Sequence, residues 1–471
     1  MNKRYIALTL TGALIASLLP GCKSLNEPIP GPDPEVSEEP EAPATQTPEL
    51  PGYNLLWADE FDGDTLNEDI WTMEVREAGW TNHELQSYEA STDNIFVKDG
   101  CLTLKAIKTE KDNGGTSYTS GKVNSQNKAD FMYGKVVIRA KAPEGQGLWP
   151  AGWMMPTDES FYGQWPKCGE IDIMEVLGHE PETAYTTIHY GEPHGQQQGL
   201  LTLENGATFA NDFHDYSVEW EPGEMRFYID DTQTLVVNDW FSAEGDVEKP
   251  YPAPFNQTFF VQMNLAVGGD WPGNPDETTN FDNAEFKIDY VRVYQKPEYD
   301  TNVTKPVYEA KAPLEDGNYV YNGDFSDAGE DLTDDVDWKF LLAQNGEGEA
   351  VIKDNMIEIT STAEGDVDYS VQLVSWDIPF EQGKKYRVTF DARAEETRKI
   401  ISCVTAPYVD WIRYYPDTEF EVGPEWQTIT YEFDMTDKTD NRGRLEFNLG
   451  HRGSTATVDI ANVRLEEIVE E

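Results

Sequence analysis

Short runs of alternating apolar and polar residues recur along most of this chain. In the run 386–393, Tyr386, Val388, Phe390 and Ala392 alternate with arginine, threonine and aspartate. A period of two places one face of a strand in a core and the other face in water. Glycine-containing turn signals separate the runs, and long helical patterns are scarce. The pattern predicts an all-β chain.

The runs fall into two sets. The first occupies residues 53–296, where segments such as 133–141 and 284–294 are typical of strands. Residues 297–313 are polar and contain three prolines, which indicates a linker. The second set occupies residues 314–468. Many short strands without helical crossovers predict a large antiparallel sandwich, followed by a second, smaller β-sandwich module.

One apolar segment, residues 165–176, carries the carboxylates Glu170, Asp172 and Glu175. Burying an acid is unfavourable unless the acid is paired or has a chemical role. On a helix the three acids would share no face. On a strand Glu170 and Asp172 share a face, and Glu175 falls one residue out of step. A single-residue bulge near Ile173 or Met174 would bring all three acids to one face.

Three acids on one face of a strand suit the nucleophile, helper and proton donor of a retaining glycosidase. A calcium cluster or a charged edge strand is the alternative. The net charge of −53 excludes nucleic acid as a partner and disfavours an anionic polymer as a substrate. The cysteines, Cys22, Cys101, Cys168 and Cys403, have no CxxC spacing, so they indicate neither a metal knuckle nor a disulfide framework.

The N-terminus predicts export. Lys3 and Arg4 precede an apolar run that is too short for a stable membrane span. The following Pro20-Gly21-Cys22 resembles a bacterial lipobox, which implies a signal peptide at 1–21 and a lipid on Cys22. An ordinary signal peptide with a chance cysteine is the alternative. The expected location is a bacterial membrane surface. A Pro/Glu-rich linker at 22–52 would tether the folded part of the chain to it.

An ordered set of motifs within residues 53–296 resembles glycoside hydrolase family 16, and its bacterial laminarinases most closely. The motifs are WADEF at 57–61, GLWPAGWM at 147–154, GEIDIME at 169–175, IHYG at 188–191, DFH at 212–214, NLAVGG at 264–269 and DYVRVY at 289–294. The resemblance implies a β-jelly-roll catalytic domain with an open cleft. It also implies retaining cleavage of an internal β-glucosidic bond, with no cofactor for catalysis.

Carried over to this chain, the resemblance makes Glu170 the nucleophile, Glu175 the acid/base and Asp172 a helper that hydrogen-bonds Glu170. The expected separation of the two glutamate carboxyl groups is about 5–5.5 Å. Tryptophan rings stack on sugar faces and polar groups bind hydroxyls, although such residues also occur in cores. The substrate-binding candidates are Asn82, Glu84, Arg139, Trp149, Trp153, Trp165, His189, Asn264 and Trp271.

A structural calcium ion is a further implication of the family. Glu60, the carbonyl of Gly100 and Asp289 fall at the matching positions, and oxygen ligands from separate strands suit a hard cation. Ordinary surface acids at strand ends are the alternative.

The spacing of the two glutamates narrows the range of expected substrates. Glu170 and Glu175 are one residue further apart than in lichenase-like relatives, as in laminarinases, agarases and carrageenases. Residues 176–181 are most similar to laminarinases, so we expect a monomeric enzyme that cuts β-1,3-glucan and also mixed-linkage β-1,3-1,4-glucan. The alternatives are a surface glycan-binding lipoprotein without turnover, and a family 16 enzyme with other specificity, either agarase-like or a transglycosylase.

The second module carries motifs of its own. YNGDF at 321–325 and YSVQL at 369–373 resemble carbohydrate-binding modules of the family 4 and 9 type. The resemblance implies a β-sandwich that binds glycan, with Tyr408, Trp411 and Tyr414 as candidates for stacking on sugars. A structural spacer is the alternative.

Overall fold

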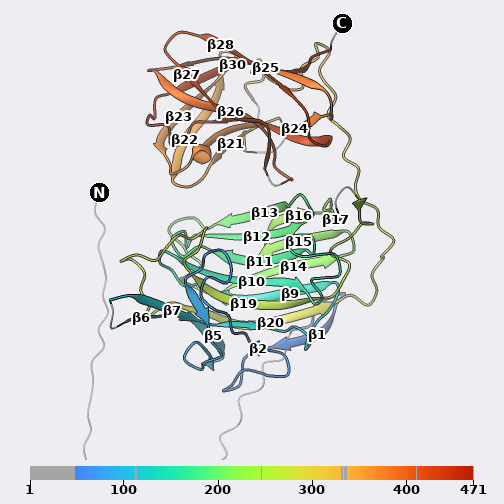
Figure 1. The fold of residues 1–471 in the computed structure, drawn as a ribbon, viewed down its shortest axis with the longest axis vertical. Helices are drawn as coiled ribbons and strands as arrows, with labels where there is room; N and C mark the ends of the chain where they lie inside the picture. The colour runs from blue at the N-terminus through green and yellow to red at the C-terminus, as the bar shows by residue number, and fades with distance from the viewer. Residues whose placement is uncertain are drawn as a thin grey trace, which may run out of the picture. The chain divides into compact units, whose positions relative to one another are not determined.

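The computed structural model describes residues 48–111, 114–244, 247–329, 332–333, 337–409 and 411–469. Regular structure within these ranges consists of β-strands and one short 3-10 helix, η1 (Asp368–Ser370) (Figure 1). The all-β prediction is confirmed. Over the same ranges, no helix has the length and apolar character needed to cross a membrane. The predicted signal peptide, Cys22 and most of the first linker lie outside the described residues.

The first domain is a sandwich of two large antiparallel sheets. One sheet has eight strands in the order β16-β15-β14-β9-β20-β5-β4, and β1 pairs with β20 beside this path. Its strands are β1 (Asn54–Asp59), β4 (Ile95–Lys98), β5 (Cys101–Lys105), β9 (Gly134–Lys141), β14 (His214–Glu221), β15 (Glu224–Ile229), β16 (Thr232–Val237) and β20 (Glu285–Gln295). The strands predicted at 133–141 and 284–294 are therefore confirmed as β9 and β20.

The other large sheet has seven strands in the order β13-β12-β11-β10-β19-β8-β2. Its strands are β2 (Thr72–Met73), β8 (Lys122–Asn124), β10 (Leu148–Pro156), β11 (Glu170–Val176), β12 (Thr183–Tyr190), β13 (Gly195–Thr202) and β19 (Phe259–Val267). Apolar side chains of both sheets meet in one buried core, to which Ile138 of β9 and Met174 of β11 belong.

A close approach between the sheets occurs at Gly152 of β10. A Cβ atom at this position would lie 2.9 Å from Cδ1 of Ile138 and 3.2 Å from Cγ of Met174. Contacts this short are rarely found in packed interiors. The glycine therefore lets Ile138 of the eight-stranded sheet pack against β10, beside Met174 of β11.

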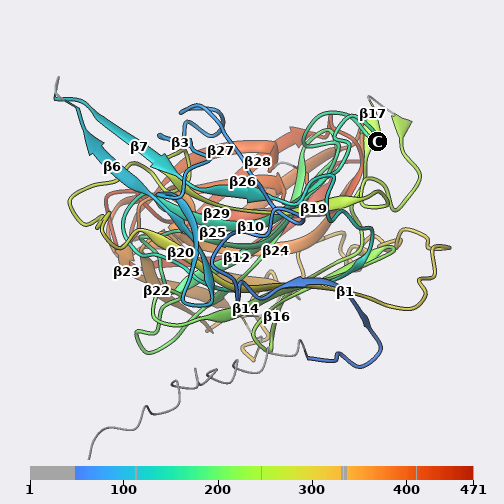
Figure 2. The same ribbon diagram turned by 90° about the horizontal axis from the view of Figure 1, so that it is seen from below.

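Two small sheets complete the described part of the first domain. β3 (Gln86–Tyr88), β7 (Thr116–Ser120) and β6 (Ile107–Glu110) form one of them, in the order β3-β7-β6. β6 and β7 extend as a hairpin beyond the large sheets of this domain (Figure 2). β17 (Ala243–Glu244) and β18 (Val247–Glu248) form the other.

The second domain is a sandwich of two five-stranded antiparallel sheets with a separate core. The strands, grouped by sheet and in order across each, are β21 (Trp338–Leu342), β24 (Val371–Phe380), β29 (Asp440–Asn448), β26 (Arg398–Ala406) and β27 (Ile412–Val422), then β22 (Gly346–Lys353), β23 (Met356–Glu364), β30 (Val458–Glu467), β25 (Lys385–Ala394) and β28 (Gln427–Asp434). Burial alternates along β25, as the sequence pattern predicts. Residues 296–314, which include the predicted second linker, form neither helix nor strand.

Candidate active site

A cleft of about 740 Å³ lies over the outer face of the seven-stranded sheet. Glu170, Asp172 and Glu175 of β11 all line it. The apolar residues between them, Ile171 and Met174, are fully buried in the core on the other face of the sheet. The prediction that one strand presents all three acids to one surface is confirmed.

A bulge in β11 produces this arrangement. Asp172 pairs with Thr187 of β12 and Glu175 pairs with Tyr185, so three steps along β11 match two steps along β12. The register with β10 shifts at the same place. The extra residue turns Glu175 from the core side to the cleft side, because strand side chains otherwise alternate between faces. The predicted bulge near Ile173 or Met174 is present.

The two glutamates have raised pKa values that differ from each other. Burial raises the pKa of Glu170 to about 7, against hydrogen bonds from Asp172 and Trp165 and the charge of Lys122, which lower it. Burial also raises the pKa of Glu175 to about 8; the charge of Glu170 raises it further, whereas a hydrogen bond from Trp149 opposes the rise. Glu170 therefore ionises first, and its charge helps Glu175 to keep a proton.

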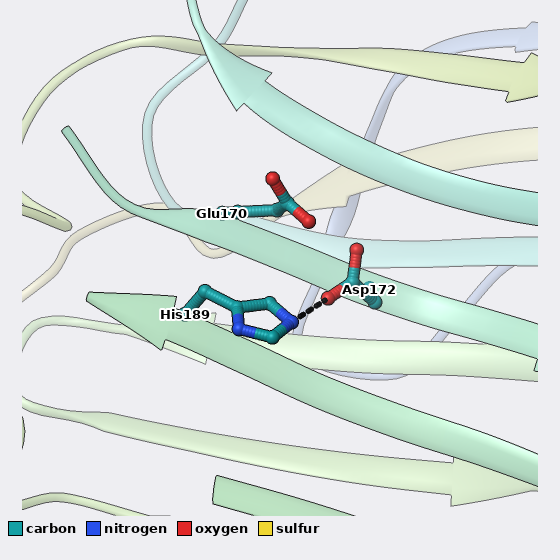
Figure 3. A group of neighbouring side chains, drawn as sticks. All are labelled: Glu170, Asp172 and His189. Atoms are coloured by element: carbon teal, nitrogen blue, oxygen red, sulfur yellow. Dashed lines mark ion pairs between the residues drawn. The ribbon is translucent and has the colours of Figure 1, made fainter. Parts of the chain in front are cut away.

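Asp172 lies between the glutamates and is the most deeply buried of the three acids. Burial and the charges of Glu170 and Glu175 raise its pKa well above the ordinary value, so that it holds a proton and hydrogen-bonds Glu170. Its Oδ2 atom lies 3.5 Å from Nε2 of His189, which reaches across from β12 (Figure 3). The prediction that Asp172 is coupled to Glu170 agrees with this geometry.

His189 is paired with Glu170 in the strand register and lines the cleft. Burial and the neighbouring His194 lower the pKa of His189 to about 3, so its ring is neutral. The donor atoms of Glu170, Asp172 and His189 lie within 4.8 Å of one another. Burial raises the pKa values of both acids, which favours protonated carboxyl groups at this point.

The predicted tryptophans all line the cleft. Trp149 packs edge-on against Trp271, with ring centroids 5.6 Å apart, and Trp153 donates a hydrogen bond to Oδ1 of Asn264 over 2.7 Å. Trp165 is the most open of these rings, with 47 % of its surface exposed. Exposed and half-buried indole faces of this kind can stack on sugar rings.

The polar candidates Asn82, Glu84 and Asn264 also line the cleft. Nδ2 of Asn82 donates to Oε1 of Glu84 over 3.2 Å, and Nδ2 of Asn264 donates to the hydroxyl of Tyr88 over 3.0 Å. The Tyr88 hydroxyl in turn donates to Glu84. These contacts hold the three side chains in place along one wall of the cleft.

The prediction for Arg139 is wrong. Arg139 lies on β9 of the eight-stranded sheet, on the face that points away from the core. Its guanidinium pairs there with Asp289 and Asp215, at 3.2 and 3.6 Å. Alternation along 134–141 predicted a half-buried strand, but it did not reveal which sheet the strand joins.

Lys122 of β8 is a cleft residue that sequence reasoning missed. Its side chain is 2 % exposed, and Nζ lies 4.7 Å from the ring centroid of Trp153 and 4.8 Å from that of Trp80. The nearest carboxylate oxygen belongs to Glu74, at 3.8 Å. A lysine between glycine and valine carries no sequence signal, because the rings that bury it come from distant segments.

A row of amide side chains was missed as well. They line the cleft from four strands or loops and offer both donors and acceptors to sugar hydroxyls. These residues are Asn124, Gln126, Gln196, Gln198 and Gln262. For Gln196 and Gln198, the run of glutamines in β13 (Gly195–Thr202) was a sequence signal that could have revealed them.

The two acids among the candidate calcium ligands already have protein partners. Glu60 accepts two hydrogen bonds from the guanidinium of Arg292, at 2.8 and 2.7 Å, and Asp289 pairs with Arg139. Gly100 lies in the turn between β4 and β5. Burial raises the pKa of Asp289 and Glu60 adds to the rise. The oxygens suit calcium in type, but a cation would compete with two arginines for them.

In the second domain, the candidates differ in exposure. Trp411 is 39 % exposed, and its ring centroid lies 4.7 Å from the guanidinium carbon of Arg444. The Tyr408 ring packs on Arg442. The prediction for Tyr414 is wrong, because this ring is buried in the domain core and its hydroxyl donates to Asp440. The ring centroid of Trp376 also lies 4.7 Å from the guanidinium carbon of Arg444.

Comparison with known proteins covers both domains. Residues 82–292 match the family model described as glycosyl hydrolases family 16, and residues 317–457 match the model described as a carbohydrate binding domain. Glucan endo-1,3-beta-glucosidase A1 of Niallia circulans is 39 % identical over 289 residues, which are 58 % of this chain and 42 % of that protein.

Two shorter relatives are matched over most of their length. Beta-glucanase of Rhodothermus marinus is 37 % identical over 253 residues, which are 52 % of this chain and 86 % of that protein. Glucan endo-1,3-beta-glucosidase of Cryptopygus antarcticus is 35 % identical over 252 residues, which are 50 % of this chain and 90 % of that protein.

A two-sheet sandwich that presents paired glutamates in a cleft lined by tryptophans and amides defines a glycoside hydrolase. Such enzymes work through carboxyl groups of the protein, and this family needs no catalytic cofactor. The chain belongs to glycosyl hydrolases family 16, and a carbohydrate binding domain follows its jelly-roll domain.

Proposed function

We propose that this protein hydrolyses internal β-1,3-glucosidic bonds of laminarin-type glucans, with retention of the anomeric configuration. The observation that carries the proposal is the pair of glutamates on one face of β11, with pKa values of about 7 for Glu170 and about 8 for Glu175. Retaining cleavage needs an ionised nucleophile, here Glu170, and a protonated acid, here Glu175.

In the first step, the Glu170 carboxylate attacks the anomeric carbon and forms a covalent ester. The bond to the leaving sugar breaks, and its oxygen takes the proton of Glu175. Glycosylation removes the charge of Glu170, which is one of the causes that raise the pKa of Glu175. Glu175 then takes a proton from water, the water oxygen attacks the anomeric carbon, and the ester bond to Glu170 breaks.

The substrate proposal is supported by the relatives, whose names describe endo-1,3-beta-glucosidase and beta-glucanase activities. The extra residue between Glu170 and Glu175, which the bulge accommodates, points in the same direction. Mixed-linkage β-1,3-1,4-glucan is proposed as a second substrate. The strongly negative chain disfavours sulfated polymers, because their charges would be repelled.

The deciding experiment digests laminarin, lichenan, agarose and κ-carrageenan with the full chain. We expect laminarin to lose viscosity faster than reducing ends appear, and the first product seen by proton NMR to be the β-anomer. Glu170→Gln should abolish cleavage and keep laminarin binding. An initial α-anomer would overturn the retaining mechanism, and cleavage of agarose instead of laminarin would overturn the substrate. Binding by the wild type without cleavage would favour a glycan-binding role.

We propose that the second domain binds glucan on the outer face of the β24-β29-β26 sheet. Arg444 and Glu446 of β29 point to this face, because Leu445 between them and Phe447 after them lie in the core. Trp411 and Trp376 each lie 4.7 Å from the Arg444 guanidinium. Aromatic rings beside a polar floor are suited to sugar rings and their hydroxyls.

We propose that the protein is exported and lipid-anchored through Cys22. The basic start, the short apolar run and the cysteine after Gly21 support this location. In a bacterial host fed labelled palmitate, the wild type should carry label in the membrane fraction. Cys22→Ala should lose the label and leave the membrane; retention of both would contradict lipidation at this residue.

We also propose a structural calcium site at Glu60, the Gly100 carbonyl and Asp289. Support comes from the family resemblance and from the oxygen ligands, which are of the type that calcium prefers. Burial raises the pKa of Asp289, against the charges of Arg139 and Arg292, and Glu60 adds a smaller rise. Calcium should raise the melting temperature of the wild type and leave that of Asp289→Asn unchanged. An equal response of both proteins, or none, would contradict the site.

A further inference from the structure

Behind the catalytic acids, His194 contacts His189 on the side away from Asp172. Nε2 of His194 lies 2.9 Å from Nδ1 of His189, and the two rings stack with centroids 5.1 Å apart. Trp165 covers His194, at 5.0 Å between centroids. His189 lines the cleft, whereas His194 belongs to the turn that joins β12 to β13. No role in the proposed mechanism accounts for His194.

The 2.9 Å contact requires one N–H and one lone pair, and the neutral ring of His189 offers one of each. Either His189 donates through Nδ1, which leaves a lone pair on its Nε2, or His194 donates through Nε2, which places the His189 proton on its own Nε2. The two arrangements present opposite groups to Asp172, and the neighbouring acid decides between them.

Asp172 needs a donor at this point. Its Oδ2 atom is buried and has no hydrogen-bond partner among the described residues, and His189 Nε2 is 3.5 Å away. The proton of Asp172 is engaged with Glu170. A His189 ring with its proton on Nε2 satisfies the orphaned oxygen, whereas the other tautomer would face it with a lone pair. A buried polar atom without a partner destabilises the arrangement that leaves it so.

We propose that His194 is a positioning residue for the catalytic acids. It donates Nε2–H to His189, which donates its own Nε2–H to Asp172, whose O–H points at Glu170. Each group in this chain donates one hydrogen bond, and the direction of every hydrogen bond follows from the first. The inference rests on the proposed catalytic roles of Glu170 and Asp172.

The turn that carries His194 is held in place on both sides. Glu192 forms an ion pair of 2.7 Å with Lys167. Gly191, at φ +75°, packs against the Phe241 ring, where a Cβ atom would lie only 2.4 Å away. The position of His194 relative to His189 is therefore set by the fold.

The proposal predicts the direction of a pH effect. Without the His194 donor, His189 is free to carry its proton on Nδ1, and the Asp172 O–H then turns from Glu170 to the His189 lone pair. Loss of this hydrogen bond, which lowers the pKa of Glu170, raises that pKa. The titratable and charged groups that act on Glu170 and His189 are Asp172 and Glu175 on β11, His194 in the turn, Lys122 on β8 and Glu159. Glu192 and Lys167 pair with each other at the turn.

The experiment compares His194→Ala and His194→Gln in the full chain. The glutamine amide can donate to Nδ1 of His189 as the ring N–H does, whereas alanine cannot. His194→Ala should lower kcat/KM on laminarin about tenfold. It should also move the acidic limb of the pH profile of kcat/KM to higher pH. His194→Gln should keep both near wild type, as should His451→Gln, an exposed histidine of the second domain.

A second readout does not depend on turnover. Long-range proton–nitrogen NMR of histidine-labelled protein should show His189 protonated on Nε2 in the wild type and in His194→Gln, and the Nδ1 form in His194→Ala. An unchanged tautomer and acidic limb in His194→Ala would overturn the proposal. Equal losses in both variants would also overturn it, since they would indicate a packing role against Trp165. Failure of the proposed activity itself would appear as absence of cleavage by the wild type.

Discussion

The indole N–H of Trp149 donates a hydrogen bond to Oε1 of Glu175 over 3.1 Å. Trp149 lies on β10, and the bulge in the neighbouring β11 turns Glu175 toward it. This hydrogen bond lowers the pKa of Glu175, whereas burial and the charge of Glu170 raise it. The pKa of Glu175 is therefore about 8. The hydrogen bond from Trp149 is the effect that limits its rise.

Trp149→Phe should raise the pKa of Glu175 by removing the donor while keeping an aromatic ring. We expect the alkaline limb of the kcat/KM profile on laminarin to move to higher pH by about one unit or less, because a neutral donor contributes ~1 kcal/mol. A profile measured from pH 5 to 10 checks this. A limb that moves to lower pH would contradict the assignment of Glu175 as the acid.

The wild-type profile itself should be narrow. Activity requires Glu170 ionised, so it should rise as pH increases through about 7, and it requires Glu175 protonated, so it should fall as pH increases through about 8. Because the two groups interact, the measured limbs belong to the pair. A broad plateau extending from pH 4 to 6 would contradict this order of ionisation.

Glu175→Gln should stabilise the fold above neutral pH. The folded pKa of about 8 exceeds the ordinary value of 4.5, so the folded state holds a proton that the unfolded state has lost. Stability therefore falls as pH rises from about 4.5 to about 8. The amide cannot ionise, and we expect a gain of ~1–3 kcal/mol in the free energy of unfolding at pH 8.

Urea unfolding at pH 8 and pH 4 tests this expectation. The gain should disappear at pH 4, where both states of the wild type are protonated. Glu349→Gln, a change at an exposed position of β22, should show no gain at either pH. A Glu175→Gln variant less stable than wild type at pH 8 would count against the burial of an ionisable Glu175.

Gly152→Ala should destabilise the contact between the two sheets. The new Cβ would meet Cδ1 of Ile138 at 2.9 Å, and overpacking of this kind costs ~1–3 kcal/mol. Ile138→Val removes that Cδ1 atom and alone should cost ~1 kcal/mol. The double variant should therefore be more stable than the sum of the single changes predicts. Strict additivity in urea unfolding would show that the two sites do not interact.

Trp411→Ala should weaken glucan binding by the second domain. Loss of a sugar-stacking ring should lower the affinity of the full chain for laminarin about tenfold, an effect of ~1.4 kcal/mol. Affinity electrophoresis of a Glu170→Gln background avoids digestion of the ligand. Trp426→Ala is the matched control, because Trp426 is equally exposed, at 42 %, but precedes β28 of the other sheet. Equal losses in both variants would contradict the proposed binding face.

The sequence predicted the all-β fold and the acidic face of β11 because both depend on local alternation. Glu170 and Asp172 are in step, Glu175 is not, and the one-residue offset was enough to predict a bulge. Alternation gives a residue's face within its own strand but not the identity of the neighbouring sheet. For this reason Arg139 was assigned to the cleft, although it lies on the other sheet, and Tyr414 was assigned to the surface, although it lies in the core.

Contacts between distant segments were beyond local reasoning. Lys122 looks like a solvent-exposed lysine in its own sequence context, and it becomes buried only where Trp80 and Trp153 converge on it. His194 presented the same difficulty. Its role follows from the distance to His189 and from an unpartnered oxygen of Asp172, neither of which a linear pattern contains.

The bulge in β11 has a consequence for how such enzymes diverge. Removal of Ile173 or Met174 would leave Glu170, Asp172 and the second glutamate at alternate positions of a regular strand, and all three would still face the cleft. A single in-frame codon thus separates two strand geometries that both keep the catalytic side chains outward. One insertion or deletion therefore changes the bend and twist around the glutamates, and with them the shape offered to the polymer, without turning any of the three acids away from the cleft.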